Sequence, residues 1–247
     1  MIMLVVMVLP IMLACSKDDE NDYVNGLDKH IIKMIVKQGD LETRTLTYTY
    51  DGQGKLIKYT DSTLPGYVFA YSYVNNQITL FTKEGGYFGE YHLNEGRIIY
   101  ADYGYKASPN SMSFKYDNNG YLLNTYNIGI SSPYMTYKWT GGNLTQIEGA
   151  NSSKVIIEYT NYPRPKHYMI FRSNIWIIRD ELMAGGFLGK SPRNLIKKIT
   201  YVNNLDEVEK EITYNYTIED GYPTRVEYKT VTKTYNEEGW YTYIWNI

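Results

Sequence analysis

The sequence predicts an all-β fold, an antiparallel meander of repeated hairpins that forms one continuous sheet. Three observations support this prediction. From about residue 30 onward, apolar and polar side chains alternate with a period of two. Thr, Tyr, Val and Ile dominate the alternating runs, as a half-buried pleated surface favours. Similar turn motifs recur along the chain, and its 247 residues are enough to enclose a sizeable core.

The first fifteen residues, MIMLVVMVLPIMLAC, carry no charge and end at the single cysteine of the chain. An apolar run of this length is too short for a bilayer span, which takes about 20 residues, and it matches the apolar region of a secretory signal peptide. Residues 12–15, Met-Leu-Ala-Cys, resemble a bacterial lipobox, in which the cysteine is acylated. We therefore expect a signal peptide over 1–14 and a lipid anchor on Cys15. The alternative is a buried N-terminal strand with an inert core cysteine.

Residues 15–27 are expected to form the lipidated N-terminus and a polar tether. Residues 16–22, Ser-Lys-Asp-Asp-Glu-Asn-Asp, are too polar to continue a core element. This run resembles the signal of one Lys followed by acidic residues that comes after the lipidated cysteine in surface-exposed lipoproteins of Bacteroidetes. The resemblance implies an outer-membrane lipoprotein exposed at the cell surface, and a periplasm-facing orientation stays open.

The alternating runs predict individual strands. Residues 46–50, Leu-Thr-Tyr-Thr-Tyr, place Leu and Tyr on one face and Thr on the other, and residues 155–160 and 212–216 alternate in the same way. Beyond the leader, no stretch keeps a helical stripe over several turns. The best short helix is predicted over 179–184, where the following glycine pair would end it.

The turns share a common chemistry. Asp51 and Asp117 each follow a tyrosine, and Gly54 and Gly120 come three residues later. The Asp side chain can accept a local backbone hydrogen bond, and the glycine can take a positive φ at little steric cost. This arrangement predicts a type I turn with a glycine bulge. Looser copies of the motif occur at 93–96, 139–143 and 235–239.

The spacing of the hairpins is regular. The aligned apolar residues are Tyr50, Tyr73, Leu93, Tyr116, Trp139 and Tyr159, which gives steps of 23, 20, 23, 23 and 20 residues. Two strands and two turns occupy about that many residues, so we expect six or seven hairpins. The spacing breaks across Pro163, Pro165 and the Gly- and Pro-rich stretch 185–192, and then returns. We therefore predict a single domain over 28–247 with a mid-chain excursion rather than two domains.

These motifs also carry a family resemblance. The Tyr-x-Tyr-Asp-x-x-Gly-x-Leu pattern that begins at Tyr48, the run from Trp139 to Leu144 and the Gly-Lys-Ser-Pro loop at 189–192 resemble a set of Bacteroidetes lipoproteins of unknown function with a porin-like fold. The resemblance implies a many-stranded meander that curls toward a barrel in a periplasmic or surface lipoprotein, without assigned catalytic residues. The short motif is also similar to the tyrosine-aspartate repeats of bacterial toxin shells.

A porin-like fold raises the question of whether the chain forms a membrane pore. One strand face is rich in Tyr, Leu and Ile, and the other carries charges such as Lys58, Lys198 and Glu227. A lipid-facing strand needs an unbroken apolar band, so the alternation alone allows a pore only if the aromatic face meets lipid. Because an acyl anchor would be of little use to a barrel embedded in the bilayer, we expect a water-soluble barrel or curved sheet.

Several classes of function are not indicated. The net charge of −2, from 25 basic and 27 acidic residues, argues against nucleic acid as a partner. A single cysteine excludes an intrachain disulfide, and His30, His92 and His167 lie in separate repeats without metal-ligand spacing. No Gly-x-Ser-x-Gly elbow or phosphate-binding motif occurs. We expect no cofactor, no metal and no enzymatic activity, with an unrecognised hydrolase as the remaining enzyme hypothesis.

The aromatic residues that fall outside the repeat are the candidate ligand contacts, because aromatic faces stack on sugars and on partner side chains. They are Tyr87, Phe88, Tyr103, Tyr105 and Trp176. Tyrosines on the repeat are expected to be structural. The triplet Asp61-Ser62-Thr63 resembles the acceptor of O-glycosylation in Bacteroidetes, with modification at Ser62. The expected function is a non-catalytic envelope lipoprotein that binds a glycan or a protein; the alternative is a structural or assembly component of the outer membrane envelope.

Overall fold

The computed structural model describes residues 29–64, 68–81, 87–103, 110–169, 182 and 184–246. They form sixteen strands: β1 (Ile31–Gln38), β2 (Arg44–Tyr50), β3 (Leu56–Asp61), β4 (Val68–Val74), β5 (Gln77–Phe81), β6 (Tyr87–Asn94), β7 (Arg97–Tyr103), β8 (Asn110–Tyr116), β9 (Leu122–Asn127), β10 (Met135–Thr140), β11 (Asn143–Gly149), β12 (Lys154–Pro163), β13 (Asn194–Val202), β14 (Val208–Glu219), β15 (Tyr222–Thr232) and β16 (Asn236–Trp245).

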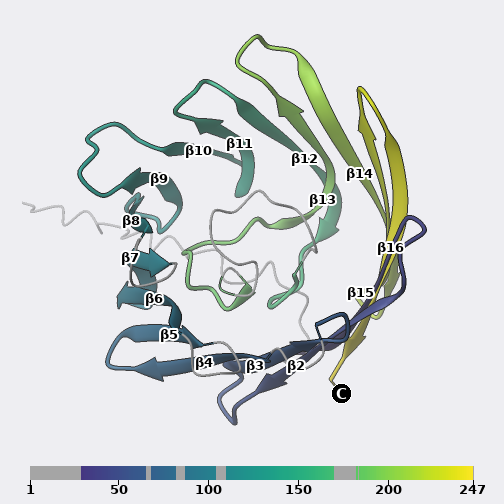
Figure 1. Cartoon of the computed structure of the whole chain (residues 1–247), viewed down its shortest axis with the longest axis horizontal. Helices are drawn as coiled ribbons and strands as arrows, with labels where there is room; N and C mark the ends of the chain where they lie inside the picture. Colours follow the sequence, from purple (N-terminus) through teal and green to yellow (C-terminus); the bar gives the residue numbers. More distant parts are fainter. Residues whose placement is uncertain are drawn as a thin grey trace, which may run out of the picture.

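These strands form a closed antiparallel barrel (Figure 1). Each strand pairs with the next one along the chain, and β1 pairs with β16, from Ile31 opposite Trp245 to Gln38 opposite Gly239. The predicted all-β meander is confirmed, and it closes into a barrel rather than remaining an open curved sheet. Sixteen strands are also one or two hairpins more than the repeat spacing indicates.

The period-two alternation places one side-chain row inside the barrel and the other outside. On the paired strands β2 and β3, Tyr48 and Tyr59 face each other and are buried, whereas Thr49 and Lys58 form the neighbouring outward pair and are exposed. The buried rows of all the strands form one continuous apolar cluster rich in Tyr, Ile and Leu. The aromatic rows therefore point into a packed interior.

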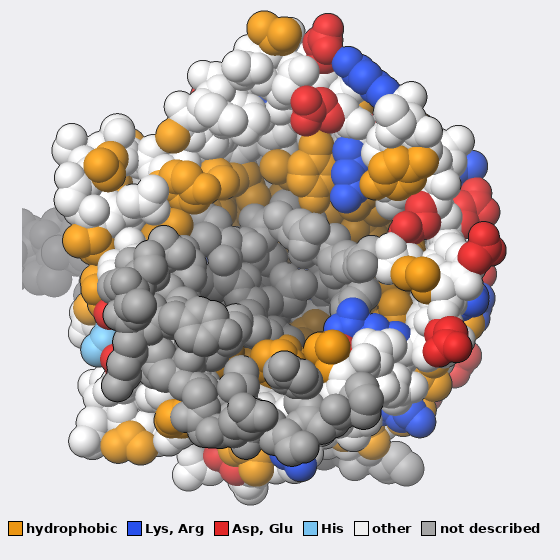
Figure 2. All heavy atoms as spheres, in the orientation of Figure 1, with side chains coloured by type: hydrophobic (Ala, Val, Ile, Leu, Met, Phe, Trp, Pro, Cys, Tyr) orange, Lys and Arg blue, Asp and Glu red, His pale blue; other side chains and the backbone are white. Residues whose placement is uncertain are grey.

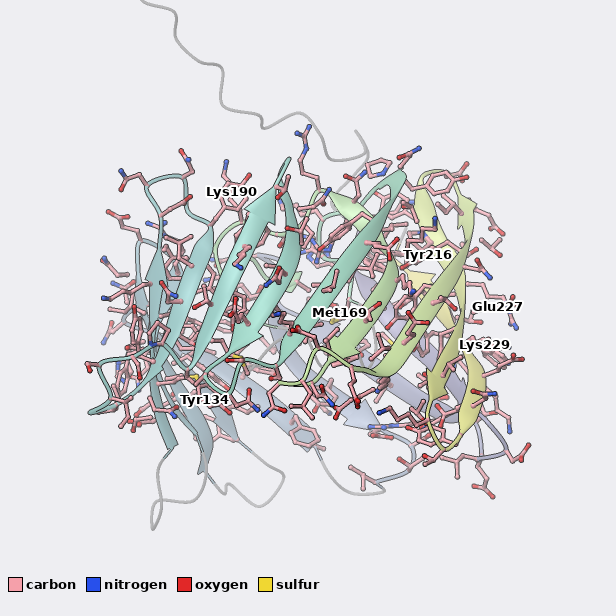
Figure 3. The ribbon with its side chains drawn as sticks, turned by 90° about the horizontal axis from the view of Figure 1, so that it is seen from above. Tyr134, Met169, Lys190, Tyr216, Glu227 and Lys229 are labelled. Carbon is pink, nitrogen blue, oxygen red and sulfur yellow. The ribbon has the colours of Figure 1, made fainter. Side chains whose placement is uncertain are left out.

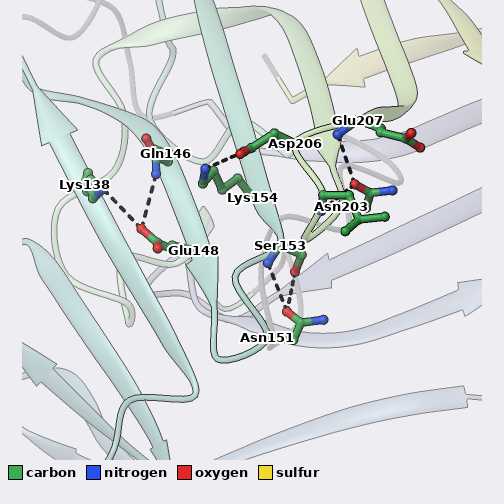
Figure 4. A network of polar contacts seen from close by, with 10 residues as sticks. Lys138, Gln146, Glu148, Asn151, Ser153, Lys154, Asn203, Asp206 and Glu207 are labelled. Atoms are coloured by element: carbon green, nitrogen blue, oxygen red, sulfur yellow. Dashed lines mark hydrogen bonds and ion pairs between the residues drawn. The ribbon is translucent and has the colours of Figure 1, made fainter.

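The outer row is mostly polar and charged, with single apolar side chains such as Ile99 and Ile156 between the polar ones. Lys138 on β10 pairs with Glu148 on β11 at 3.2 Å, and Lys229 on β15 pairs with Glu238 on β16 at 3.0 Å. Figure 2 shows charged side chains gathered on the outside of the barrel over β14–β16 and hydrophobic ones along its inner wall, and Figure 3 shows Glu227 and Lys229 projecting outward. Polar contacts continue along β10–β14 and their loops (Figure 4). The barrel thus buries its apolar row and exposes its polar row.

The mid-chain excursion lies within the barrel. Its described part, residues 164–169, 182 and 184–193, is called the plug here; it lies inside the ring of strands in Figure 1. Tyr243 of β16 donates a hydrogen bond to the Met169 carbonyl at 2.9 Å, and the Phe187 carbonyl accepts one from the Ile98 N–H of β7 at 2.8 Å. Leu182 and Leu188 belong to the same apolar cluster as the barrel wall. The plug therefore fills the interior and ties opposite sides of the wall together.

A ring of side-chain hydrogen bonds clamps one end of the barrel, which we call the aromatic rim. At this end each even-numbered strand ends and the next odd-numbered strand begins. An aromatic donor near the end of an even strand bonds to a backbone carbonyl near the start of the preceding odd strand, at 2.6–2.9 Å. The donors are Tyr50, Tyr73, Tyr116, Trp139, Tyr159, Tyr216 and Trp245. At Leu93, on β6, the repeat carries no such donor.

This ring explains the regular spacing of tyrosines in the sequence. The aromatic residue must recur once per hairpin because each clamp joins two neighbouring strands at the same height. The expectation that repeat tyrosines are structural is therefore supported by a specific bond, from the hydroxyl or indole N–H to a backbone carbonyl of the neighbouring strand.

The Asp-based turns form as predicted, whereas the looser copies differ. Asp51 accepts the N–H groups of Gln53 and Lys55 at 2.8 and 2.9 Å, and Gly54 has a φ of +76°. The copies at 93–96 and 139–143 instead form two-residue turns with positive φ at both central positions, because Asn94 pairs with Arg97 and Thr140 with Asn143.

The predicted turn at 235–239 is wrong. Asn236 to Gly239 lie in β16, and the turn is made earlier, where the Thr232 N–H donates to the Tyr235 carbonyl at 2.9 Å. Gly239 faces Tyr228 of β15, and a Cβ there would lie 2.3 Å from the Lys37 carbonyl oxygen of β1 and 2.5 Å from the Tyr228 ring. This glycine therefore makes room for an aromatic ring rather than closing a turn.

The expected signal peptide (1–14) and most of the tether (15–27), including Cys15, lie outside the described residues, so they stay predictions. Leu182 and Ala184 are helical, in agreement with the short helix predicted over 179–184, but the other residues of that stretch are not described. In the described part of the chain, no helix is long and apolar enough to cross a membrane.

The clamps can be tested by removing one hydroxyl. Tyr116→Phe should lower the free energy of unfolding by about 1 kcal/mol, because the Ile98 carbonyl loses its hydrogen bond while the ring stays in place. Urea titration followed by circular dichroism would measure this loss. The matched control, Tyr162→Phe at a residue that is 56% exposed, should leave the stability unchanged. Equal stabilities of the two variants would contradict a clamping role.

High pH should unfold the barrel through its buried tyrosines. Burial raises the pKa of Tyr168, Tyr216 and Tyr243 above the usual value near 10. The unfolded chain ionises these phenols at about pH 10, so the stability that they contribute is complete below this pH and decreases as the pH rises above it. Absorbance at 295 nm should then show late ionisation that coincides with loss of the circular dichroism signal. Complete tyrosine ionisation with an intact barrel signal would contradict this.

Candidate functional site

The predicted off-repeat aromatics fall at one end of the barrel. Tyr87 and Phe88 begin β6, and Tyr103 ends β7, opposite Gly89. All three lie toward the end opposite the aromatic rim, which we call the far rim. Their side chains, and the whole of Tyr105 and Trp176, lie outside the described residues. Their role as ligand contacts therefore stays a prediction.

Ser62 lies in the exposed turn after β3. Its Oγ accepts the Thr45 N–H at 2.8 Å, and its own N–H donates to the Thr45 carbonyl at 2.9 Å. The neighbouring Asp61 is buried and forms an ion pair with Arg44. Burial raises the pKa of Asp61, but hydrogen bonds from Arg44 and Thr63 outweigh this effect and hold it below its usual value. Ser62 is thus an exposed residue in a fixed turn, and its glycosylation stays a prediction.

A pocket of about 420 Å³ opens at the far rim, between β1, β14, β15 and β16. We call it the tyrosine pocket, because four tyrosines line it together with polar side chains. Its lining residues are Gln38, Lys210, Ile212, Tyr214, Tyr228, Thr230, Tyr235, Glu237 and Tyr241. A volume of this size lies within the range that holds small ligands.

The wall of the tyrosine pocket contains a stacked aromatic pair. The rings of Tyr228 and Tyr241 lie 5.1 Å apart, between centroids, at an interplanar angle of 15°. Gly239, paired with Tyr228 across the sheet, has no side chain to displace the ring. Tyr235 stands at the mouth and is 53% exposed. The pocket therefore has a fixed aromatic wall and one accessible ring.

The polar groups of the pocket are held in place by one another. The Glu237 carboxylate accepts a hydrogen bond from the Tyr228 hydroxyl at 3.0 Å and another from the Gln38 amide at 2.9 Å. Lys210 lies with its ammonium group 5.2 Å from the centroid of the Tyr201 ring. Fixed acceptors and donors beside aromatic rings are suited to hydrogen-bond the hydroxyls of a ligand while its apolar faces contact tyrosine.

The histidines are arranged differently from the sequence expectation. His30, at the start of β1, and His167, in the plug, lie in separate repeats, but the fold stacks their rings at 4.1 Å with an interplanar angle of 20°. Tyr50 also contacts His30, with 4.6 Å between the ring centroids. His92 lies elsewhere, against Tyr100. Among the described residues, no three metal-ligating side chains come together.

Sequence reasoning missed the tyrosine pocket because its residues come from four strands that meet only when β1 pairs with β16. One local signal was present. A glycine interrupts the inward row of β16, and a gap of this kind in a strand marks a place where another group approaches closely.

Comparisons with known proteins were made on the sequence and on the fold. No protein-family model matches the chain, and no curated protein matches it. Solved structures do: a porin-like protein from Bacteroides uniformis ATCC 8492 aligns with a TM-score of 0.68 at 16% identity, over 87% of this chain and 98% of that one. A porin-like protein from Bacteroides vulgatus ATCC 8482 aligns with a TM-score of 0.58 at 16% identity, over 89% of this chain and 99% of that one. The chain thus has the porin-like β-barrel fold.

Proposed function

We propose that this protein is a non-catalytic lipoprotein of the bacterial cell envelope that binds a glycan in the tyrosine pocket of a water-facing barrel. The observation that carries the proposal is the pocket itself: the stacked Tyr228 and Tyr241, with Glu237 fixed by two hydrogen bonds beside them. Sugars present both apolar faces and hydroxyls, and this wall offers a partner for each.

The polarity of the outer row supports a barrel that faces water. Ion pairs such as Lys198 with Glu211 and Lys138 with Glu148 lie on strands of the outer wall. A charged Lys at the midplane of a bilayer costs about 2–4 kcal/mol, and the outer row would carry several such charges into lipid. Contact with water removes this cost, so attachment to the membrane through a lipid on Cys15 fits the barrel better than insertion does.

The plug supports binding rather than conduction. It occupies the lumen and bonds to β7 and β16 on different sides of the wall. A pore of the porin type needs an aqueous lumen. A pocket at the barrel mouth, by contrast, needs only a firm floor, which the buried Tyr214 and Tyr241 supply.

The alternative of a structural or assembly component receives less support. A component of that kind would have to pair the edges of its sheet with another protein. In the described barrel, β1 and β16 pair with each other, and closure removes free edges. A protein ligand at the tyrosine pocket remains an outcome of the test below.

The glycan proposal predicts an effect of the exposed ring at the pocket mouth. Tyr235→Ala should weaken glycan binding about fivefold, because an aromatic contact contributes about 1 kcal/mol. A glycan array would identify the ligand, and calorimetry would measure its affinity for both proteins. Tyr162→Ala, at a residue of similar exposure outside the pocket, is the matched control and should bind as the unaltered protein does. Absence of any glycan signal together with capture of one envelope protein would contradict the proposal in favour of a protein ligand.

The membrane proposal predicts how the chain partitions. The full-length protein extracted from membranes should enter the detergent phase of Triton X-114 and show added acyl mass on Cys15. Residues 22–247 should stay in the aqueous phase, since the outer row of the barrel is polar. Recovery of residues 22–247 in the detergent phase, or ion conductance of this fragment in planar bilayers, would show instead that the barrel enters lipid.

A further inference from the structure

The acidic group of the tyrosine pocket is bonded to neutral donors. Glu237 of β16 lines the pocket and is half-buried. Its Oε1 accepts a hydrogen bond from the Tyr228 hydroxyl at 3.0 Å, and its Oε2 accepts one from the Gln38 amide at 2.9 Å. Among the residues that the structure describes, no Lys, Arg or His forms an ion pair with this carboxylate. Glu237 therefore brings to the pocket a negative charge with which no described cation is paired.

The Glu237 carboxylate can accept further hydrogen bonds. A carboxylate offers about four lone-pair sites, and two of them are used by the hydroxyl and the amide. A negative charge in a partly buried site is unfavourable without a cation. A neutral acceptor would be enough to hold one hydroxyl and one amide. The charge of Glu237 is thus suited to a ligand that brings both a positive charge and N–H donors.

The basic residue in the pocket lining, Lys210, is directed toward a different strand. It lies on β14, and β15 separates it from Glu237 on β16. Two steps between neighbouring strands place these backbones about 10 Å apart. The Lys210 ammonium lies 5.2 Å from the centroid of the Tyr201 ring on β13, on the side of β14 away from β16. A ligand cation is therefore favoured at the Glu237 side of the pocket.

Tyr235 offers an aromatic face close to this carboxylate. It precedes Glu237 by two residues, and both line the pocket. The Tyr235 N–H donates to Thr232 Oγ1 at 3.0 Å, and its carbonyl accepts the Thr232 N–H at 2.9 Å, so the backbone at the pocket mouth is fixed. Its ring has no cation from the described part of the chain over its face. The face of a tyrosine ring attracts an ammonium group, which adds to the attraction of the carboxylate.

We propose that the glycan bound in the tyrosine pocket contains an amino sugar whose nitrogen is a free ammonium group. The ammonium donates to the Glu237 carboxylate and lies against the Tyr235 ring. Thr230 lies directly across the sheet from Glu237, and its hydroxyl can bond to a hydroxyl of the sugar. The inference rests on the proposed function, because it names the class of glycan that the same pocket takes. An N-acetylated amino sugar carries no positive charge and should bind less tightly.

Calorimetry on the full-length protein tests the charge of the sugar. Glucosamine and galactosamine are compared with their N-acetyl forms and with glucose and galactose, and ethanolamine serves as an amine without a ring. At least one amino sugar should bind saturably and about tenfold more tightly than its N-acetyl and neutral counterparts. Its affinity should fall as NaCl is raised, because salt screens the attraction. Ethanolamine should bind more weakly, since it leaves the tyrosine wall uncovered.

Two matched variants locate the charge. Glu237→Gln keeps the size of the side chain and should weaken the amino sugar about tenfold, to the affinity of its neutral counterpart. Glu238→Gln removes the same charge from the next residue of β16, whose side chain pairs with Lys229 on the outer wall, and should bind as the unaltered protein does. The salt dependence of the unaltered protein is a second measurement that does not depend on how either variant folds.

The possible failures are distinguishable. The inference is overturned if no amino sugar binds, if the N-acetyl or neutral sugars bind as tightly, or if Glu238→Gln weakens binding as much as Glu237→Gln does. Equal affinity for ethanolamine would overturn the sugar and leave only an amine site. Binding of a neutral glycan that Tyr235→Ala weakens would overturn the amino sugar while the proposed function stands. Absence of any glycan signal on the array would overturn both.

Discussion

The space inside a closed barrel of sixteen strands is the constraint on which the rest of this structure depends. Barrels of this strand number enclose a lumen too wide for the side chains of the wall to fill, and membrane porins leave it to water. Here the wall sends large rings such as Tyr48, Tyr214 and Tyr241 inward, and the plug occupies what remains. The abundance of tyrosine, the polar outer row and the long interruption of the repeat all follow from filling that space.

Filling the lumen from inside also inverts the usual polarity of a porin. The interior becomes a protein core, and binding can occur only where that core is incomplete, at the two ends. The far rim holds stacked tyrosines around Glu237, and the aromatic rim holds the hydrogen-bonded aromatic donors and the basic residues of the plug. These ends differ because the described part of the plug reaches the aromatic rim, where its basic residues meet the turns.

Much of the wall could be predicted from sequence, because strand alternation and the Asp51 and Asp117 turns are local. The recurrence of aromatic residues also predicted a structural role for them. It could not predict which backbone carbonyl each one binds. Closure, the place of the excursion and the tyrosine pocket could not be predicted, since they depend on contacts between residues far apart in the chain, such as Gln38 with Glu237. The turn predicted over 235–239 is wrong for a related reason. Gly239 makes room for the Tyr228 ring of a neighbouring strand and does not close a local turn.

The seam between β1 and β16 has a consequence for how the molecule is made. Strand β1 pairs with β16, so the barrel stays open until β16 has joined the sheet. Tyr243 of that last strand bonds to the Met169 carbonyl, so the strand that closes the wall also holds the plug. Pairing between such distant segments is intrinsically slow. A sheet that has not yet closed exposes its apolar face, so the seam between β1 and β16 is also what protects the interior from aggregation.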